Sequence, residues 1–137
     1  MNKEVMILTG AGQIGMAIAR RMGYGMKIVV GDRSLDNAKA ICQTMNNAGF
    51  DTVAFEMDLS SRESILALIA KAQKYGEISK LVNAAGVSPS QAPIEMILHV
   101  DLYGTAVLLD EVGKVIKPGG TGVTTVSYTH LRAHETC

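Results

Sequence analysis

The sequence has 137 residues, of which 47% are hydrophobic, and its formal net charge at pH 7 is zero. A chain of this length forms one domain or part of one. The sequence carries neither a basic stripe nor a block of like charges, which argues against a nucleic-acid binder or a membrane-surface binder. No apolar run reaches the roughly 18 residues that a membrane span needs.

The N-terminus and the cysteines indicate the compartment. The opening residues MNKEV lead directly into an apolar run, without the pattern of a signal peptide. Cys42 and Cys137 are far apart and isolated, so they suggest neither a disulfide framework nor a metal site. We therefore expect a protein of the reducing cytoplasm, with Cys42 in the core of a helical segment.

The first half of the chain alternates between two hydrophobic periods. Residues 4–10 form a short apolar run that ends in glycine, which is typical of a strand buried on both faces. Residues 13–23 carry apolar side chains at helical spacing and end in glycine. A second buried strand is predicted at 26–32, and a second helix at 34–49, where Ser34 is a good N-cap.

The second half repeats this alternation. It predicts strands at 51–58, 80–86 and 121–127 and helices at 60–76 and 94–116. The helix at 60–76 begins with a capping-box pattern, in which Ser60 or Ser61 precedes Glu63. Strict alternation of strands and crossover helices predicts an α/β fold, a Rossmann-type doubly wound parallel sheet with helices on both faces, in three αβα layers. We assign residues 1–125 to this domain.

A glycine-rich segment follows the first strand. Residues 9–15, TGAGQIG, place Gly10, Gly12 and Gly15 in G-x-G-x-x-G spacing at the start of a helix. Such glycines permit a tight turn, close approach of a pyrophosphate and close helix–strand packing, and the helix N-terminus attracts phosphate. The context satisfies the condition that this motif requires. The candidate dinucleotide-binding residues here are Thr9, Gly10, Gly12, Gln13, Ile14 and Gly15; the alternative is a glycine turn without a ligand.

The second strand ends in a carboxylate. Asp32 lies roughly 20 residues after Gly10, the spacing expected for an acidic residue that bonds the adenosine ribose. A carboxylate there favours NAD, because it repels the 2′-phosphate of NADP. Arg33 beside it is able to accept that phosphate, so NADP stays open. Asp32 has a plainer alternative role in starting the next turn.

Two further segments sit at carboxyl ends of predicted strands. MDLSS at 57–61 contains Asp58 and Leu59, and LVNAAGVS at 81–88 contains Asn83, Ala84, Ala85 and Gly86. With the glycine loop, these segments resemble the short-chain dehydrogenase/reductase family over residues 3–126. The resemblance implies that Asp58 and Leu59 border the adenine, whereas the segment 83–86 lines the nicotinamide side.

The resemblance also implies an activity. Members of that family transfer a hydride between a nicotinamide cofactor and a carbonyl or alcohol carbon, and they usually form homodimers or homotetramers. A Tyr, with a Lys four residues later, supplies the proton, and a Ser at the end of the fifth strand polarises the carbonyl. Asp101 occupies the position of an Asn that is usual in the family; as an ionised carboxylate it accepts hydrogen bonds but does not donate them.

The last residues differ from the rest. Ser127 fits the family's Ser, which places the expected Tyr beyond position 137, and Tyr128 with Arg132 is a poor match for the Tyr–Lys pair. Residues 126–136 resemble the translation of a sequencing adapter. We therefore expect residues 126–137 to be a non-native tail, and the chain to be an N-terminal fragment that stops after the fifth strand, without Tyr and Lys and without turnover.

Alternative functions remain at this point. One is a non-catalytic dinucleotide-binding or sensor protein on the same fold, and another is a different Rossmann enzyme, such as an epimerase-type or alcohol dehydrogenase domain. The apolar residues of the predicted helix 94–116 serve either the core or a partner, and we expect the core; they are Ile97, Leu98, Leu102, Leu108 and Leu109. No metal ligand set is predicted.

Overall fold

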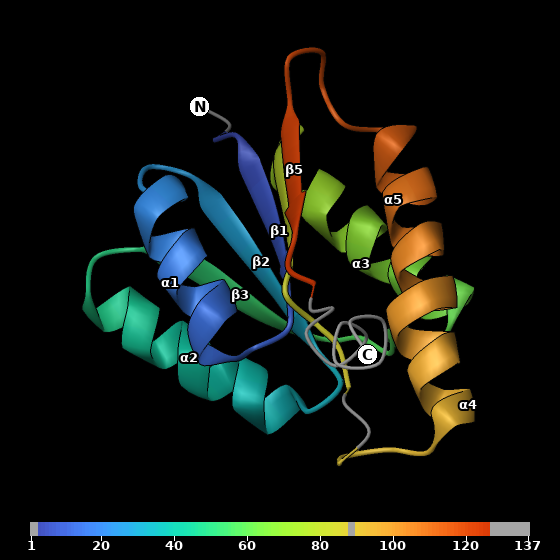
Figure 1. Ribbon diagram of the computed structural model, residues 1–137. Helices are drawn as coiled ribbons and strands as arrows, with labels where there is room; N and C mark the ends of the chain where they lie inside the picture. Colours follow the sequence, from blue (N-terminus) through green and yellow to red (C-terminus); the bar gives the residue numbers. More distant parts are fainter. Residues whose placement is uncertain (1–2, 88–89, 127–137) are drawn as a thin grey trace, which may run out of the picture.

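Five parallel strands form the centre of the molecule. The computed structural model describes residues 3–87 and 90–126. The strands are β1 (Val5–Thr9), β2 (Lys27–Asp32), β3 (Asp51–Glu56), β4 (Ile78–Asn83) and β5 (Thr121–Thr124). All pairings are parallel, and the order across the sheet is β3-β2-β1-β4-β5 (Figure 1). The predicted Rossmann-type sheet is confirmed, although its fifth strand ends at Thr124 rather than at residue 127.

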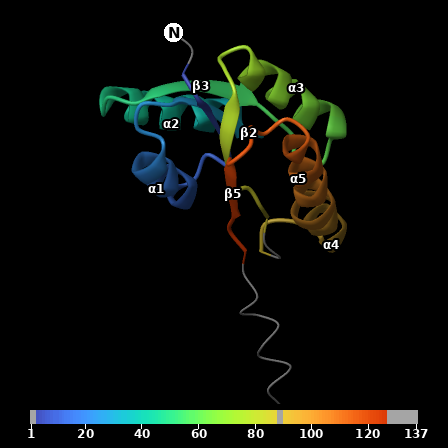
Figure 2. The same ribbon diagram turned by 90° about the horizontal axis from the view of Figure 1, so that it is seen from above.

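Helices cover both faces of this sheet. They are α1 (Gln13–Met22), α2 (Leu35–Asn47), α3 (Arg62–Gln73), α4 (Ile94–Ile97) and α5 (Thr105–Gly113), with a π-helical segment η1 (Leu98–Gly104) between α4 and α5. Figures 1 and 2 show α1 and α2 on one face, and α3 with α5 on the other. The three-layer arrangement is therefore confirmed.

The central strand contributes side chains to two separate cores. Val5 and Ile7 of β1 pack in the cluster beneath α3 and α5, whereas Met6 and Leu8 pack in the cluster beneath α1 and α2. All four side chains are fully buried. This two-sided burial is why the strand is a continuous apolar run in the sequence. Cys42 lies in the second cluster, as predicted, and burial raises the pKa of its thiol.

Serine side chains begin two of the helices. Ser34 Oγ accepts a hydrogen bond from the Asn37 amide at 3.3 Å, which confirms the predicted N-cap of α2. Ser61 caps α3 by accepting from the amide of Ser64, also at 3.3 Å. The predicted capping box with Glu63 is wrong, because the third helical position after Ser61 is Ser64.

The segment predicted as one helix over 94–116 is divided. It runs as α4, η1 and α5 and ends at Gly113. A Cβ atom on Gly104 would lie 2.3 Å from the carbonyl oxygen of Leu59, so the backbone approaches the β3–α3 connection at a distance that only glycine permits. Single π-helical turns within α-helices are frequent near functional sites. Hydrophobic periodicity does not distinguish them from regular helix.

The apolar residues of this segment divide between core and surface. Leu108 is fully buried and Ile97 is partly buried. Leu98, Leu102 and Leu109 are 51%, 66% and 47% exposed, so the prediction that they belong to the core is wrong. One side of the segment packs on α3 and the sheet, and these three leucines lie on the other side. Within the described residues, no helix is both long and apolar enough to cross a membrane.

Candidate functional site

A cavity of about 260 Å³ opens at the carboxyl ends of the central strands. The central strand β1 lies between β2 and β4, and the cavity lies at the carboxyl ends of these strands. Open α/β sheets bind ligands at such a switch point, where the strand order reverses. Its lining residues are Gly10, Ala11, Gly12, Gly31, Asp32, Arg33, Met57, Asp58, Leu59, Ala84, Ala85, Gly86, Val87 and Val100.

The glycines of the β1–α1 loop have three different surroundings. Gly10 has a φ of +93°, and a Cβ there would lie 2.6 Å from the Ala85 amide nitrogen. A Cβ on Gly15 would lie 2.8 Å from the Gly10 carbonyl oxygen and 3.2 Å from Ala84 Cβ. Gly12 has no such neighbour within 4 Å. Gly10 and Gly15 therefore allow close packing inside the protein, whereas Gly12 faces open space.

The N-terminus of α1 has no side-chain cap. Gly12 is its N-cap residue, and the first turn carries no acidic residue. Helices α2 and α3, in contrast, are capped by Ser34 and Ser61. The first amides of a helix have no intrahelical acceptor, and the helix dipole adds partial positive charge there. The loop therefore presents free N–H groups to an anion beside the cavity.

Asp32 connects two loops at the edge of the cavity. Its Oδ1 accepts a hydrogen bond from the Ala11 amide, and its Oδ2 accepts one from the Ser34 amide, both at 2.9 Å. Its carboxylate is thereby fixed between the glycine loop and the start of α2. Arg33 is exposed beside it, with Nη1 3.7 Å from the sulfur of Met96.

Asp58 and Leu59 form another part of the lining. The Ser60 hydroxyl and the Ser60 amide both donate to Asp58 Oδ1, at 2.7 Å and 3.0 Å. The hydroxyl bond is the main reason why the pKa of Asp58 lies below its ordinary value, and Arg33 lowers it further. Asp58 is therefore ionised at neutral pH. Leu59 is buried and contributes its backbone carbonyl to the contact with Gly104.

The segment after β4 completes the cavity with small residues. Ala84, Ala85 and Gly86 line it, whereas Asn83 is fully buried behind it. Asn83 Oδ1 accepts from the Thr9 hydroxyl at 2.6 Å, and its Nδ2 donates to Thr105 Oγ1 at 3.3 Å. Asn83 thus holds the ends of β1 and β4 and the start of α5 together.

Asp101 lies on the π-helical segment next to this loop. Its Oδ1 accepts a hydrogen bond from the Val87 amide at 2.9 Å. A Cβ on Gly86 would lie 3.2 Å from the same oxygen. The exposed Asp101 side chain therefore connects η1 to the end of the cavity formed by residues 84–87. Ser127, the other residue with a predicted catalytic position, lies outside the described residues.

Most of the predicted cofactor-binding residues lie at the cavity. Thr9, Gln13, Ile14, Gly15 and Asn83 are not in its lining: Thr9 and Asn83 are fully buried, Gly15 packs inside, and Gln13 and Ile14 are exposed on the first turn of α1. The lining residues that the sequence analysis missed are Ala11, Gly31, Met57, Val87 and Val100. Each of them adjoins a predicted site residue, and Val100 directly precedes Asp101, so their positions could have been inferred.

Among the described residues, no group of three or more His, Cys, Asp or Glu side chains is arranged to hold a metal ion.

A family model described as short chain dehydrogenase matches residues 4–132. The chain belongs to the short-chain dehydrogenase family.

Individual family members show the extent of this similarity. The chain is 38% identical over 123 residues to the short-chain dehydrogenase/reductase bsc3 of Alternaria brassicicola, with 90% of this chain and 45% of that protein covered. It is 31% identical over 145 residues to human carbonyl reductase (NADPH) 3, with 98% and 52% covered. The chain thus spans about half the length of these relatives.

Solved structures confirm the fold. A short-chain dehydrogenase/reductase from Burkholderia phymatum in complex with NAD superposes with a TM-score of 0.80 at 24% sequence identity. The superposition covers 92% of this chain and 50% of that one. The described residues therefore have the fold of a short-chain dehydrogenase/reductase, and the superposition covers nearly all of this chain.

Proposed function

We propose that this chain is the cofactor-binding part of an NAD(P)-dependent oxidoreductase that acts on a small carbonyl or alcohol substrate. The observation that carries the proposal is the uncapped N-terminus of α1, open at Gly12, beside a cavity that contains the fixed carboxylate of Asp32. An uncapped helix N-terminus is a site for a pyrophosphate, and a fixed carboxylate is an acceptor for ribose hydroxyl groups. Both features fit a dinucleotide.

The proposed roles follow from position. The amides of Gly12 to Gly15 bind the pyrophosphate, and Asp32 accepts from the adenosine ribose. Asp58 and Leu59 border the adenine, and residues 84–86 border the nicotinamide side. Thr9 and Asn83 act behind the cavity as positioning residues, since both are fully buried.

The bound nicotinamide would supply the chemistry, as acceptor or donor of a hydride at its ring, while the protein contributes orientation and a proton. In the 137 residues, no tyrosine is followed by a lysine four residues later. We therefore infer that this chain binds the cofactor but does not by itself turn over substrate. Asp101 and Ser127 retain their proposed places near the substrate, Asp101 through its bond to the Val87 amide.

The proposed preference is for NAD over NADP. Asp32 is held by two backbone amides, so its negative charge cannot easily turn away from a 2′-phosphate placed at the ribose. Arg33 is the group that would favour NADP, but its guanidinium is directed to Met96. The relative named as a carbonyl reductase (NADPH) is the reason to test both cofactors directly.

Calorimetric titration of the purified chain with NAD and NADP tests this proposal. We expect NAD to bind more tightly than NADP, and Asp32→Ser to reduce that discrimination by weakening NAD. Lys39→Ser, a change on the exposed side of α2 away from the cavity, is the control and leaves both affinities unchanged. Absence of binding by both cofactors, with the fold intact, would contradict the proposal.

The proposed assembly is a homodimer or homotetramer. Its support is the apolar surface formed by Leu98, Leu102 and Leu109 on the helical segment from α4 to α5. Sedimentation velocity of the wild-type chain and of Leu102→Lys tests it. We expect the wild type to sediment as an oligomer and the variant to shift toward the monomer; a wild type that stays monomeric would contradict it.

A further inference from the structure

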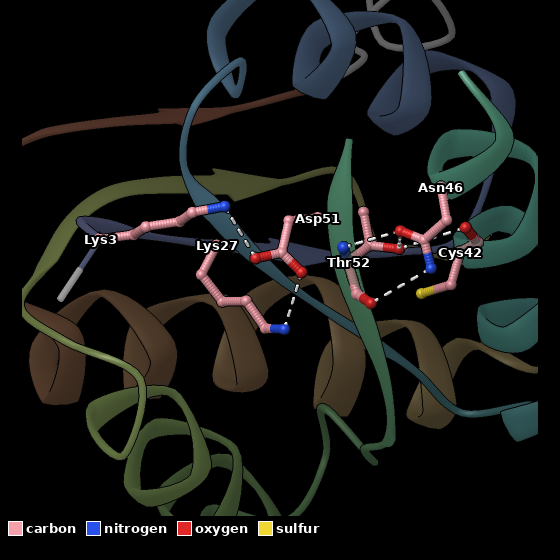
Figure 3. Close-up of polar contacts among 6 residues, drawn as sticks. All are labelled: Lys3, Lys27, Cys42, Asn46, Asp51 and Thr52. Carbon is pink, nitrogen blue, oxygen red and sulfur yellow. Dashed lines mark hydrogen bonds and ion pairs between the residues drawn. The ribbon is translucent and has the colours of Figure 1, made fainter. Parts of the chain in front are cut away.

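The outer edge of the sheet at β3 carries an unusual side-chain pairing. Among the described residues, β3 is the terminal strand of the sheet, and β2 is its one partner. Near its start, the Thr52 amide donates to Asn46 Oδ1 at 2.8 Å, and Asn46 Nδ2 donates to the Thr52 carbonyl at 3.4 Å (Figure 3). One side chain thus occupies both outward-facing backbone groups of an edge residue.

The connection between α2 and β3 makes this pairing possible. Asn46 is in the last turn of α2, and the chain turns through Gly49, which has a φ of +94°, to begin β3 at Asp51. The tight turn returns the strand alongside the helix end. The Thr52 hydroxyl lies 2.8 Å from Asn46 Oδ1 and 3.2 Å from the Cys42 carbonyl, so it also helps to hold the helix end against the strand.

A carboxamide is the side chain that can do this. It is planar and carries one acceptor and one donor group, as the peptide group of a neighbouring strand does. An aspartate in its place would accept from the Thr52 amide, but it has no donor for the carbonyl. An alanine would leave both backbone groups of Thr52 to water.

The rest of this edge is only partly protected. Alternate residues of a strand direct their backbone groups to the same side, so Ala54 and Glu56 present their amides and carbonyls to the same edge as Thr52. Beside Thr52, the Asp51 carboxylate binds Lys27 Nζ at 2.9 Å and Lys3 Nζ at 3.1 Å (Figure 3). Lys27 begins β2 and Lys3 precedes β1, so these ion pairs hold Asp51 toward the inside of the sheet and leave the outer edge to Asn46.

We propose that Asn46 closes the edge of β3 against pairing with β3 of a second copy of this chain. Its carboxamide stands where the first peptide group of the added strand would have to bind. Asn46 thus occupies the first outward-facing residue, Thr52, and an added strand is left with Ala54 and with Glu56, which carries a charge at the end of the edge. The proposal is independent of cofactor binding, because none of these residues lines the candidate cofactor cavity.

Hydrogen exchange and sedimentation of Asn46→Ala test this proposal. Asn47→Ala is a matched control, because Asn47 is the next residue of α2 and is exposed, and no side-chain hydrogen bond joins it to the described residues. In dilute solution we expect the Thr52 amide to exchange about 5-fold faster in Asn46→Ala, as loss of one hydrogen bond of about 1 kcal/mol implies. Amides of β2 should stay unchanged in both variants.

Protein concentration then separates the outcomes. On concentration, we expect Asn46→Ala to sediment faster than the control and to regain protection at Thr52 and Ala54, which locates the contact at β3 and not at β5. Asn46→Asp, which keeps the acceptor, should associate less than Asn46→Ala and remains informative if the alanine variant folds poorly. Equal sedimentation of all variants, or association without protection at β3, would overturn the proposal.

Discussion

The hydroxyl of Thr9 donates to Asn83 Oδ1 across 2.6 Å in the fully buried layer directly behind the cavity. This bond joins β1 to β4 at the point where the two cavity-forming loops leave the sheet. Thr9→Val keeps the shape but leaves Asn83 Oδ1 without this donor. We expect a loss of about 1–3 kcal/mol in the free energy of unfolding, measured by urea denaturation, because a buried polar atom becomes unsatisfied.

Thr44→Val is the matched control for that substitution. Thr44 is exposed on α2, and its hydroxyl donates to the Ala40 carbonyl of its own helix. We expect a change within about 0.5 kcal/mol, as for most surface substitutions. Equal effects of the two substitutions would contradict a structural role for the Thr9–Asn83 bond.

Two glycines of the β1–α1 loop should respond differently to alanine. Gly12 has an extended backbone, with φ of −112° and ψ of 179°, and open space at its Cβ position. We expect Gly12→Ala to retain wild-type stability and to lose affinity for NAD by roughly tenfold, about 1.4 kcal/mol, because the methyl group occupies the path of the pyrophosphate. Calorimetric titration and thermal unfolding measure the two effects.

Gly10→Ala should instead destabilise the fold. The residue needs a positive φ, and its Cβ would meet the Ala85 backbone. A loss of about 1–3 kcal/mol or more is expected from the strain. If Gly12→Ala bound NAD as the wild type does, the assignment of this loop to the pyrophosphate would be wrong.

A second glycine pair tests the contact of the π-helical segment. Gly104→Ala places a methyl group against the Leu59 carbonyl, and we expect it to destabilise the protein by about 1–3 kcal/mol. Gly113→Ala, at the end of α5, meets nothing within 4 Å and should stabilise by about 0.5–1 kcal/mol. Chemical denaturation compares them. Equal stabilities would show that the close approach to Leu59 does not persist in solution.

Asp58 should give stability a specific dependence on pH. Its pKa is lowered in the folded protein, chiefly by the Ser60 hydroxyl, so its contribution is present above its unfolded pKa of about 3.9 and is lost as pH falls through the folded pKa. We expect Ser60→Ala to raise the pKa of Asp58, measured by carbon NMR of its carboxyl group. The variant should lose up to about 1 kcal/mol at neutral pH and nothing at low pH.

Ser61→Ala provides the contrast for that prediction. It removes the neutral N-cap bond to the Ser64 amide, which costs roughly 1 kcal/mol without involving the Asp58 carboxylate. Its stability deficit should therefore remain as pH falls. A deficit of Ser60→Ala that does not change with pH would show that the hydroxyl does not stabilise the charged form of Asp58.

The fold could be predicted from the sequence because its elements have strong local patterns. The buried run around Ile7 and the serine caps at Ser34 and Ser61 each depend on nearby residues. The π-helical turn could not, since the contact of Gly104 with Leu59 joins residues far apart in the chain. The exposure of Leu102 depends equally on which helix face meets α3, and periodicity does not determine that.

Some features of the candidate site could also be predicted from the sequence, and others could not. The position of Gly12, Asp32 and Asp58 at the cavity could be predicted, because ligand-binding residues in this type of fold follow the ends of strands. The sequence did not show that Asp32 binds two loop amides, or that Asn83 lies behind the cavity and not in its wall. Such relationships arise from tertiary packing and have no signature in a single stretch of sequence.

We propose that the cavity at the carboxyl ends of the strands binds a nicotinamide dinucleotide. Titration of the isotopically labelled chain with NAD, followed by amide NMR, tests it most directly. We expect saturable shifts at Gly12 to Gly15, at Asp32 and Arg33, at Asp58 and at Ala84 to Gly86, with little change in the β3 edge at Thr52. A folded chain whose amides do not respond to millimolar NAD, or respond only away from these residues, would contradict it.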